Sequence, residues 1–252
     1  MITIEGVNHQ IGAVRILHGI RTKLPEGRLT ALIGPNGAGK STLMRLIGRL
    51  EALQSGQITV AGHDLATTPT GELAKVMAIL GQNTAIASRL RVTELVGFGR
   101  WPHHHGRPGP EDRDKIAQAL EAFALTPLAN RFLDEISGGQ AQRAHIAMSL
   151  AQDTPWLLLD EPLNNLDMAH ARGLMTQLSD LVHARGRSVA MVVHEINYAA
   201  AWADHVIAMK DGQIMAEGGP ETVLTESVLS ELYDTHVRVG RHRDRPLVLH
   251  HA

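Results

Sequence analysis

One stretch of the sequence has the residue types and spacing of a phosphate-binding loop. Its members are Gly34, Pro35, Asn36, Gly37, Ala38, Gly39, Lys40 and Ser41, followed by Thr42. Glycines let the backbone curl so that successive N–H groups point at phosphate oxygens, and a following helix adds partial positive charge at its N-terminus. Lys40 can reach the β- and γ-phosphates of a nucleotide, and the Ser41 hydroxyl can bind Mg²⁺. The stretch therefore predicts a site for ATP and Mg²⁺ and not an ordinary glycine-rich turn.

Two carboxylates follow an apolar run at residues 156–159. If that run is a buried strand, Asp160 at its end is aimed at the metal, usually through a water molecule. Glu161 projects differently and can polarise an attacking water as a general base. Acids also cap strand ends for purely structural reasons, but their position downstream of a phosphate-binding loop favours the catalytic interpretation.

The elements that position these residues are short apolar runs separated by helical patterns. After the loop, Leu43, Leu46, Ile47 and Leu50 recur at helical spacing. Strand–helix alternation with continuous apolar strands predicts a buried, mostly parallel sheet in an α/β fold. The runs expected to form strands of that sheet are residues 28–33, 77–80, 156–159, 189–193 and 206–209. Shorter strands are expected at residues 2–4, 14–20 and 58–61.

The pattern changes to helices separated by Gly/Pro loops over residues 84–135. One helix is expected to begin at Pro110, with Glu111 and Asp112 in its first turn. Ile116, Leu120 and Phe123 would lie together on its apolar face. We expect a helical subdomain at about residues 84–150, inserted into a single domain of residues 1–252.

Composition excludes several classes of function. The formal net charge of −2 gives no basic field that would attract nucleic acid, so no nucleic-acid partner is expected. The absence of cysteine excludes disulfides, thiolate zinc sites and cysteine nucleophiles. No apolar run is long enough to span a membrane, and the N-terminus is not a signal peptide, so we expect a protein on the cytosolic side.

A second glycine-containing segment lies just before the run at 156–159. Ile136 precedes it, and it consists of Ser137, Gly138, Gly139 and Gln140. Ser137 and Gln140 can form a capping box that opens a helix at residues 140–151. The same exposed helix N-terminus is also suited to binding an anion. The segment resembles the L-S-G-G-Q signature of ABC ATPases, with Ile in place of Leu.

The resemblance to ABC ATPases covers nearly the whole chain. Gln82 resembles the glutamine of the Q-loop, residues 165–167 resemble the D-loop that ends in Asp167, and His194 resembles the switch histidine. It implies a nucleotide-hydrolase core with an N-terminal antiparallel β portion and an inserted helical subdomain. It also implies that Gln82 contacts Mg²⁺ and water, that His194 contacts the γ-phosphate, and that two copies sandwich ATP.

Two further stretches, residues 99–103 and 159–168, resemble the ATPase subunits of bacterial iron–siderophore importers. That resemblance implies a many-helix membrane permease, a periplasmic or lipoprotein substrate-binding protein, and a peripheral location on the cytoplasmic side of the inner membrane. The same two stretches are also similar to those of importers of haem, cobalamin or other metal chelates, and these alternatives stay open. A soluble ABC ATPase such as an iron–sulfur assembly factor is the alternative outside transport.

One feature departs from the family pattern. ABC ATPases stack an aromatic side chain on the adenine, and by spacing that position is Ile11 in a stretch without aromatic residues from position 1 to 50. An aliphatic or histidine contact is the expected replacement. The histidine runs at residues 103–105 and 250–251 lack acidic or cysteine companions, so we interpret them as solvated segments and not as metal sites.

Overall fold

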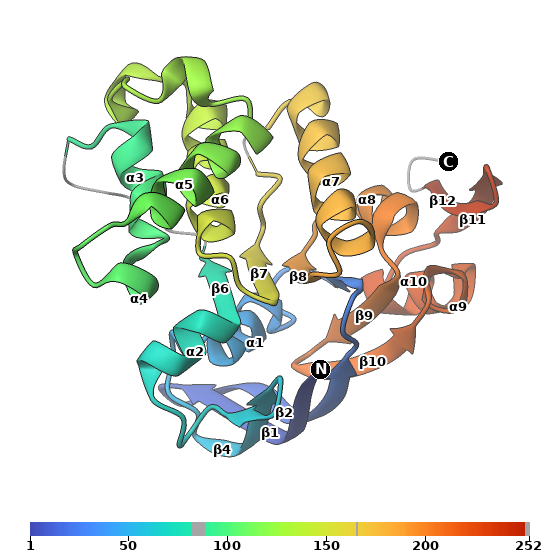
Figure 1. Ribbon diagram of the computed structural model, residues 1–252. Helices are drawn as coiled ribbons and strands as arrows, with labels where there is room; N and C mark the ends of the chain where they lie inside the picture. Colours follow the sequence, from blue (N-terminus) through green and yellow to red (C-terminus); the bar gives the residue numbers. More distant parts are fainter. Residues whose placement is uncertain (82–88, 165, 250–252) are drawn as a thin grey trace.

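The computed structural model describes residues 1–81, 89–164 and 166–249 and shows two sheets with helices packed between and around them (Figure 1). The N-terminal sheet is antiparallel and has the strand order β2-β1-β4-β5. Its strands are β1 Ile2–Ile11, β2 Val14–Leu24, β4 Ser55–Val60 and β5 His63–Asp64. The expected antiparallel portion is therefore confirmed, with strands longer than the sequence runs indicated.

The second sheet has the order β10-β9-β3-β8-β7-β6, in which all neighbours are parallel except β10 and β9. Its strands are β3 Leu29–Ile33, β6 Met77–Leu80, β7 Trp156–Asp160, β8 Ser188–Val192, β9 His205–Lys210 and β10 Gln213–Gly218. Every residue of β3, β7 and β8 is buried, which explains their uninterrupted apolar sequences. Since parallel strands share a direction, the segments that follow β3, β7 and β8 meet at one edge of the sheet.

Alternate residues of the parallel strands pack on opposite faces of the sheet. Leu157 and Leu159 belong to the apolar cluster that includes α7 Met168–His183, whereas Leu158 belongs to the cluster that includes α1 Lys40–Ile47. This alternation follows from the two-residue repeat of a strand. Helix α1 thus fills the space between the two sheets, and α7 covers the other face (Figure 1).

Helices occupy the chain between β6 and β7 in the part that the structure describes. They are α3 Val92–Phe98, α4 Trp101–His104, α5 Pro110–Ala122 and α6 Gly138–Ala151, with 3₁₀ turns at Thr126–Leu128 and Leu133–Glu135. Helix α5 begins at Pro110 as predicted, and α6 begins two residues earlier than predicted. A buried ion pair joins Arg100 to Asp112 at 3.0 Å and fixes α5 against the start of α4, where Arg100 is the N-cap residue. As Figure 1 shows, these helices form a lobe beside α7.

The C-terminal part contains more regular structure than its polar sequence indicated. After α8 Ile196–Trp202 and β10 come α9 Pro220–Val223, α10 Glu226–Tyr233 and a hairpin of β11 Arg238–His242 with β12 Arg245–Leu249. Asn197 of α8 anchors the hairpin, because its side chain accepts a bond from Val248 N at 2.9 Å and donates one to Val248 O at 3.2 Å. The remaining helix is α2 Thr70–Val76, which precedes β6. In the described ranges, no helix has the length and apolar character needed to cross a bilayer.

Candidate functional site

The segment after β3 has the backbone of a phosphate cradle. Gly34 and Gly39 have φ values of 143° and 92°, in the region that favours glycine. A side chain at Gly34 would collide with the backbone oxygen of Met209, and one at Gly39 would lie 2.6 Å from the Leu17 side chain. The tight turn between β3 and α1 therefore depends on glycine at both positions.

Lys40 is held in the cradle by backbone carbonyl groups. Its Nζ donates to the carbonyl oxygens of Gly34 and Pro35 at 2.8 and 2.9 Å, and the residue is 5% exposed. Burial lowers the pKa of the Lys40 ammonium, while the nearby carboxylates of Glu161 and Asp160 oppose that shift. A phosphate group would add negative charge at this point and would stabilise the protonated lysine.

The candidate metal ligands come from two elements that the fold places together. The Ser41 hydroxyl, in the first turn of α1, donates to Oδ1 of Asp160 at 2.8 Å. Burial raises the pKa of the Asp160 carboxyl, and the bond from Ser41 opposes this shift. An adjacent cation would favour the ionised carboxylate, so the pair fits Mg²⁺ held by two protein oxygens with phosphate and water. In the described ranges no group of three or more His, Cys, Asp or Glu residues could hold a metal by itself.

Glu161 lies at the centre of a small polar cluster at the end of β7. Its Oε1 is 2.7 Å from Nε2 of His194, which follows β8, and its Oε2 accepts a bond from Nδ2 of Asn164 at 2.6 Å. Glu161 itself has a φ of 54°, so the backbone turns sharply directly after Asp160. The adjacent acids therefore point to different partners. Asn164 was not singled out from the sequence, because its contact depends on this turn.

A cavity of about 220 Å³ contains the residues of this site. It is lined by residues 36–42, Glu161, His194 and Ile16. The fold therefore brings together the phosphate-binding loop, the second acid and His194, which the resemblance to ABC ATPases led us to expect near the phosphates. Ile16 of β2 was not singled out from the sequence. Ile11 is 52% exposed at the end of β1, and a contact of Ile11 with adenine remains a prediction.

The signature segment, residues 137–140, does not line that cavity. Ser137 is the N-cap of α6: its Oγ accepts from Gln140 N at 3.3 Å, and its own N–H donates to Gln140 Oε1 at 2.9 Å. The expected capping box is present. A side chain built at Gly138 would meet no atom within 4 Å, so the start of the helix is open.

Asp167 is also a helix cap and lies outside the cavity lining. Its Oδ1 accepts from the backbone N–H of His170 at 2.8 Å at the start of α7, and it pairs with the His170 ring at 2.8 Å. The backbone bond is the main cause that lowers the pKa of the Asp167 carboxyl.

Other residues singled out from the sequence fall outside the described ranges or contact protein groups. Gln82, Asn165 and the histidine run at 250–251 lie outside the described residues. His103 Nε2 lies 2.8 Å from the carbonyl oxygen of Gln152, and the His104 ring contacts Trp101 edge-on.

Comparison with known proteins identifies related sequences over most of the chain. A family model described as ABC transporter matches residues 17–164. The chain is 43% identical over 239 residues to the petrobactin import ATP-binding protein YclP of Bacillus subtilis, covering 95% of each chain. It is 38% identical to the ferric enterobactin transport ATP-binding protein FepC of Escherichia coli, covering 88% of this chain and 83% of the other. It is 35% identical to the hemin import ATP-binding protein HmuV of Shewanella denitrificans, covering 92% and 93%.

Solved structures show the same fold. A metal-chelate type ABC transporter in an inward-facing conformation contains a chain that matches with a TM-score of 0.84 and 25% identity, covering 98% of this chain and 95% of that one. A dimeric post-hydrolysis state of the ATP-binding cassette MJ0796, bound to ADP and Pi, matches with a TM-score of 0.79 and 27% identity, covering 87% and 98%.

Proposed function

The chain belongs to the ABC transporter family, and we propose that it is the ATP-hydrolysing subunit of an importer for ferric siderophores. It is an ATPase by family, with one nucleotide site per chain formed by the end of β3 and the start of α1. The main support for this proposal is that Lys40, Glu161 and His194 line the same cavity.

Each residue of the site has a role that its position supports. Residues 36–42 surround the phosphates with backbone N–H groups, and Lys40 supplies positive charge to their oxygens. Ser41 and Asp160 would hold Mg²⁺, with Gln82 as the third candidate. Mg²⁺, when bound, would neutralise charge on the transferred phosphate.

Glu161 is the general base of the proposed reaction, and it orients and polarises the attacking water. His194 contacts Oε1 of this carboxylate and faces the same cavity, from which it can reach the γ-phosphate. Asn164 holds the other carboxylate oxygen, so that the orientation of Glu161 is fixed from two sides.

The proposed cargo follows from the transport functions for which relatives of similar length are named. Those names specify import of petrobactin and transport of ferric enterobactin, at 43% and 38% identity. Haem import is the second candidate, because a hemin import protein is also related at 35% identity over 92% of this chain.

The proposed assembly contains two copies of the chain on a membrane permease, on the cytoplasmic side of the cell membrane. A periplasmic or lipoprotein binding protein would deliver the cargo. The open N-terminus of α6 supports the two-copy arrangement, because the N–H groups of Gly138 and Gly139, unlike those of Ser137 and Gln140, are not used in the capping box and do not face their own cavity. A partner copy related by a two-fold axis can present that end, with Gly138 and Gly139, to the γ-phosphate.

Uptake in a strain that lacks the gene tests the proposed function. Uptake of radiolabelled iron from petrobactin and from enterobactin should be lost, and the wild-type gene should restore it. The Glu161→Gln gene should not restore it, although the variant chain accumulates normally. Normal siderophore uptake together with lost uptake of haem would replace the cargo assignment by the second candidate.

A further inference from the structure

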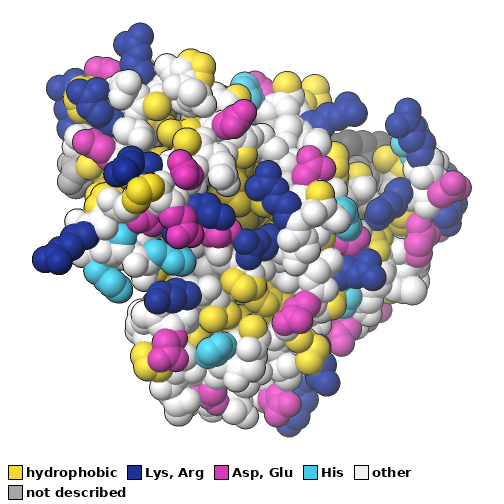
Figure 2. All heavy atoms as spheres, viewed as in Figure 1, with side chains coloured by type: hydrophobic (Ala, Val, Ile, Leu, Met, Phe, Trp, Pro, Cys, Tyr) yellow, Lys and Arg dark blue, Asp and Glu magenta, His cyan; other side chains and the backbone are white. Residues whose placement is uncertain are grey.

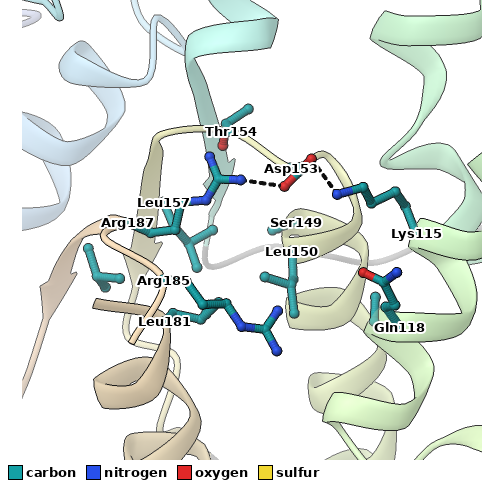
Figure 3. A pocket seen from close by; sticks show the side chains of 12 residues that line it. Lys115, Gln118, Ser149, Leu150, Asp153, Thr154, Leu157, Leu181, Arg185 and Arg187 are labelled. Atoms are coloured by element: carbon teal, nitrogen blue, oxygen red, sulfur yellow. Dashed lines mark hydrogen bonds and ion pairs between the residues drawn. The ribbon is translucent and has the colours of Figure 1, made fainter. Parts of the chain in front are cut away.

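A second cavity, of about 200 Å³, lies away from the nucleotide site (Figure 3). Leu157 of β7 lines it and packs on the α7 face of the sheet, whereas Leu158 packs on the α1 face. Asp160 lies roughly 10 Å further along the same strand. The other walls of the cavity come mainly from α5, from the end of α6 and from the segment between α7 and β8. The cavity is thus between the helical lobe and the sheet, and it is separate from residues 34–42.

Three cationic side chains surround the cavity, together with one carboxylate. Asp153 Oδ2 is 2.8 Å from Lys115 Nζ, and Asp153 Oδ1 is 2.6 Å from Arg187 Nη2. Arg185 makes no ion pair or hydrogen bond within the part of the chain that the structure describes. In Figure 3 its guanidinium group extends across the opening toward Gln118. The lining therefore carries an excess of positive charge, on a chain whose formal net charge is −2.

The remainder of the lining combines apolar side chains with the neutral polar side chains of Gln118, Ser149 and Thr154. Leu150, Leu157 and Leu181 form part of it. Figure 2 shows a hollow near the middle of the face, between the helical lobe and α7, with Lys and Arg side chains around hydrophobic atoms. Ligand cavities commonly combine apolar lining residues with polar groups that orient the ligand, and those for drug-sized ligands have about 300–1,000 Å³. The volume here suits a smaller molecule.

We propose that this cavity binds a small organic oxyanion, a phosphate or carboxylate on an apolar body. The free guanidinium of Arg185 binds the oxyanion by charge-assisted hydrogen bonds, and the leucines contact the apolar body. Asp153 competes with the ligand, because it already occupies the Lys115 and Arg187 cations. A bound ligand contacts both α5 and the segment before β8, and so it connects the helical lobe to the sheet.

Isothermal titration calorimetry with phenyl phosphate and with benzoate tests this proposal at low ionic strength. A saturating concentration of ADP occupies the nucleotide site during the titration, so binding that persists is binding elsewhere. Wild-type protein should bind at least one of the two probes, and the stronger probe identifies phosphate or carboxylate as the preferred group. Benzyl alcohol, which lacks the negative charge, should not bind measurably.

Two substitutions should change the affinity in opposite directions. Arg185→Ala should weaken binding by about tenfold or more, because a hydrogen bond to a charged group is lost. Asp153→Asn should strengthen binding, because it frees two cations. Asn also tolerates the left-handed backbone at this position, where φ is 57°. Arg113→Ala is the matched control, since Arg113 is an exposed arginine of α5 outside the cavity lining.

Circular dichroism and thermal unfolding establish that each variant is folded before it is titrated. Arg185→Ala should pass this check, because Arg185 is exposed and its side chain has no partner in the described ranges. Absence of binding to wild-type protein with ADP present would overturn the proposal. Equal loss of affinity in Arg185→Ala and Arg113→Ala would also overturn it, because the binding would then follow net charge and not the cavity.

Discussion

Oε1 of Glu161 and Nε2 of His194 lie 2.7 Å apart, although the residues follow different strands, β7 and β8. The strands pair in parallel with Asp160 opposite Val192, and so the residues after them emerge at the same edge of the sheet. The register of two buried strands therefore sets the geometry of the proposed base and the proposed γ-phosphate contact.

Glu161→Gln should retain ATP binding but reduce turnover by about 100-fold or more, because an amide cannot act as general base. The ATP-bound dimer should then accumulate, since hydrolysis no longer reopens it. Size-exclusion chromatography with ATP and Mg²⁺ should show the dimer, and chromatography with ADP should not. A wild-type rate of hydrolysis would refute the assignment of Glu161.

Asn164→Ala should lower kcat while leaving the affinity for ATP nearly unchanged. The substitution removes the amide that holds Oε2 of Glu161 at 2.6 Å, and Asn164 does not line the nucleotide cavity. We expect a loss of about tenfold, typical of a misplaced catalytic group. Asn164→Gln retains an amide and should recover part of the loss. A fall in ATP affinity with unchanged kcat would show that Asn164 acts in binding.

Lys40→Ala should weaken binding of a fluorescent ATP analogue by about tenfold or more, because charge-assisted contacts with phosphate oxygens are lost. The backbone cradle remains, so binding should be reduced and not abolished. Arg49→Ala is a suitable control, because Arg49 lies just beyond α1 and is not part of the cavity lining. The phosphate-binding interpretation fails if Lys40→Ala changes neither affinity nor hydrolysis.

The stability of the protein should fall as the pH drops below about 6.5, partly because of His145 on α6. Burial lowers the pKa of His145 from 6.5, its Nδ1 has no partner, and the residue is 6% exposed. The unfolded chain binds a proton near pH 6.5 while the folded chain does not, so stability present above this pH is lost on acidification. Urea unfolding at pH 7.5 and 5.5 should show a smaller loss for His145→Gln than for wild-type protein. An identical loss would remove His145 as a contributor.

The parallel strands could be predicted from the sequence, because strands that are buried on both faces have continuous apolar runs. The runs at 156–159 and 189–193 match β7 and β8 to within one residue at each end. The phosphate-binding loop and the capping box of Ser137 could also be predicted, because both depend on the spacing of residues close together in the sequence.

The C-terminal hairpin was missed because its signals are not local. Its turn consists of Arg243 and Asp244, both with positive φ, where Asn-Gly would have indicated a two-residue hairpin. Strand β12 alternates between exposed and buried residues, and its anchor is Asn197, which lies about 50 positions earlier in the sequence. The contact of Asn164 with Glu161 could not be predicted either, because it requires the left-handed backbone conformation at Glu161.

The central claim is that two copies of the chain share each ATP site, and mixing two inactive variants tests it most directly. Gly139→Asp places negative charge at the open start of α6, where the partner's phosphate must approach, and Lys40→Ala disables the cradle. In a mixed dimer one site carries both lesions and the other carries neither. We predict that the mixture regains about a quarter of wild-type ATPase activity, because about half of the dimers are mixed and each has one intact site. Wild-type activity of the Gly139→Asp chain alone, or no recovery although mass measurement shows mixed dimers, would contradict this account.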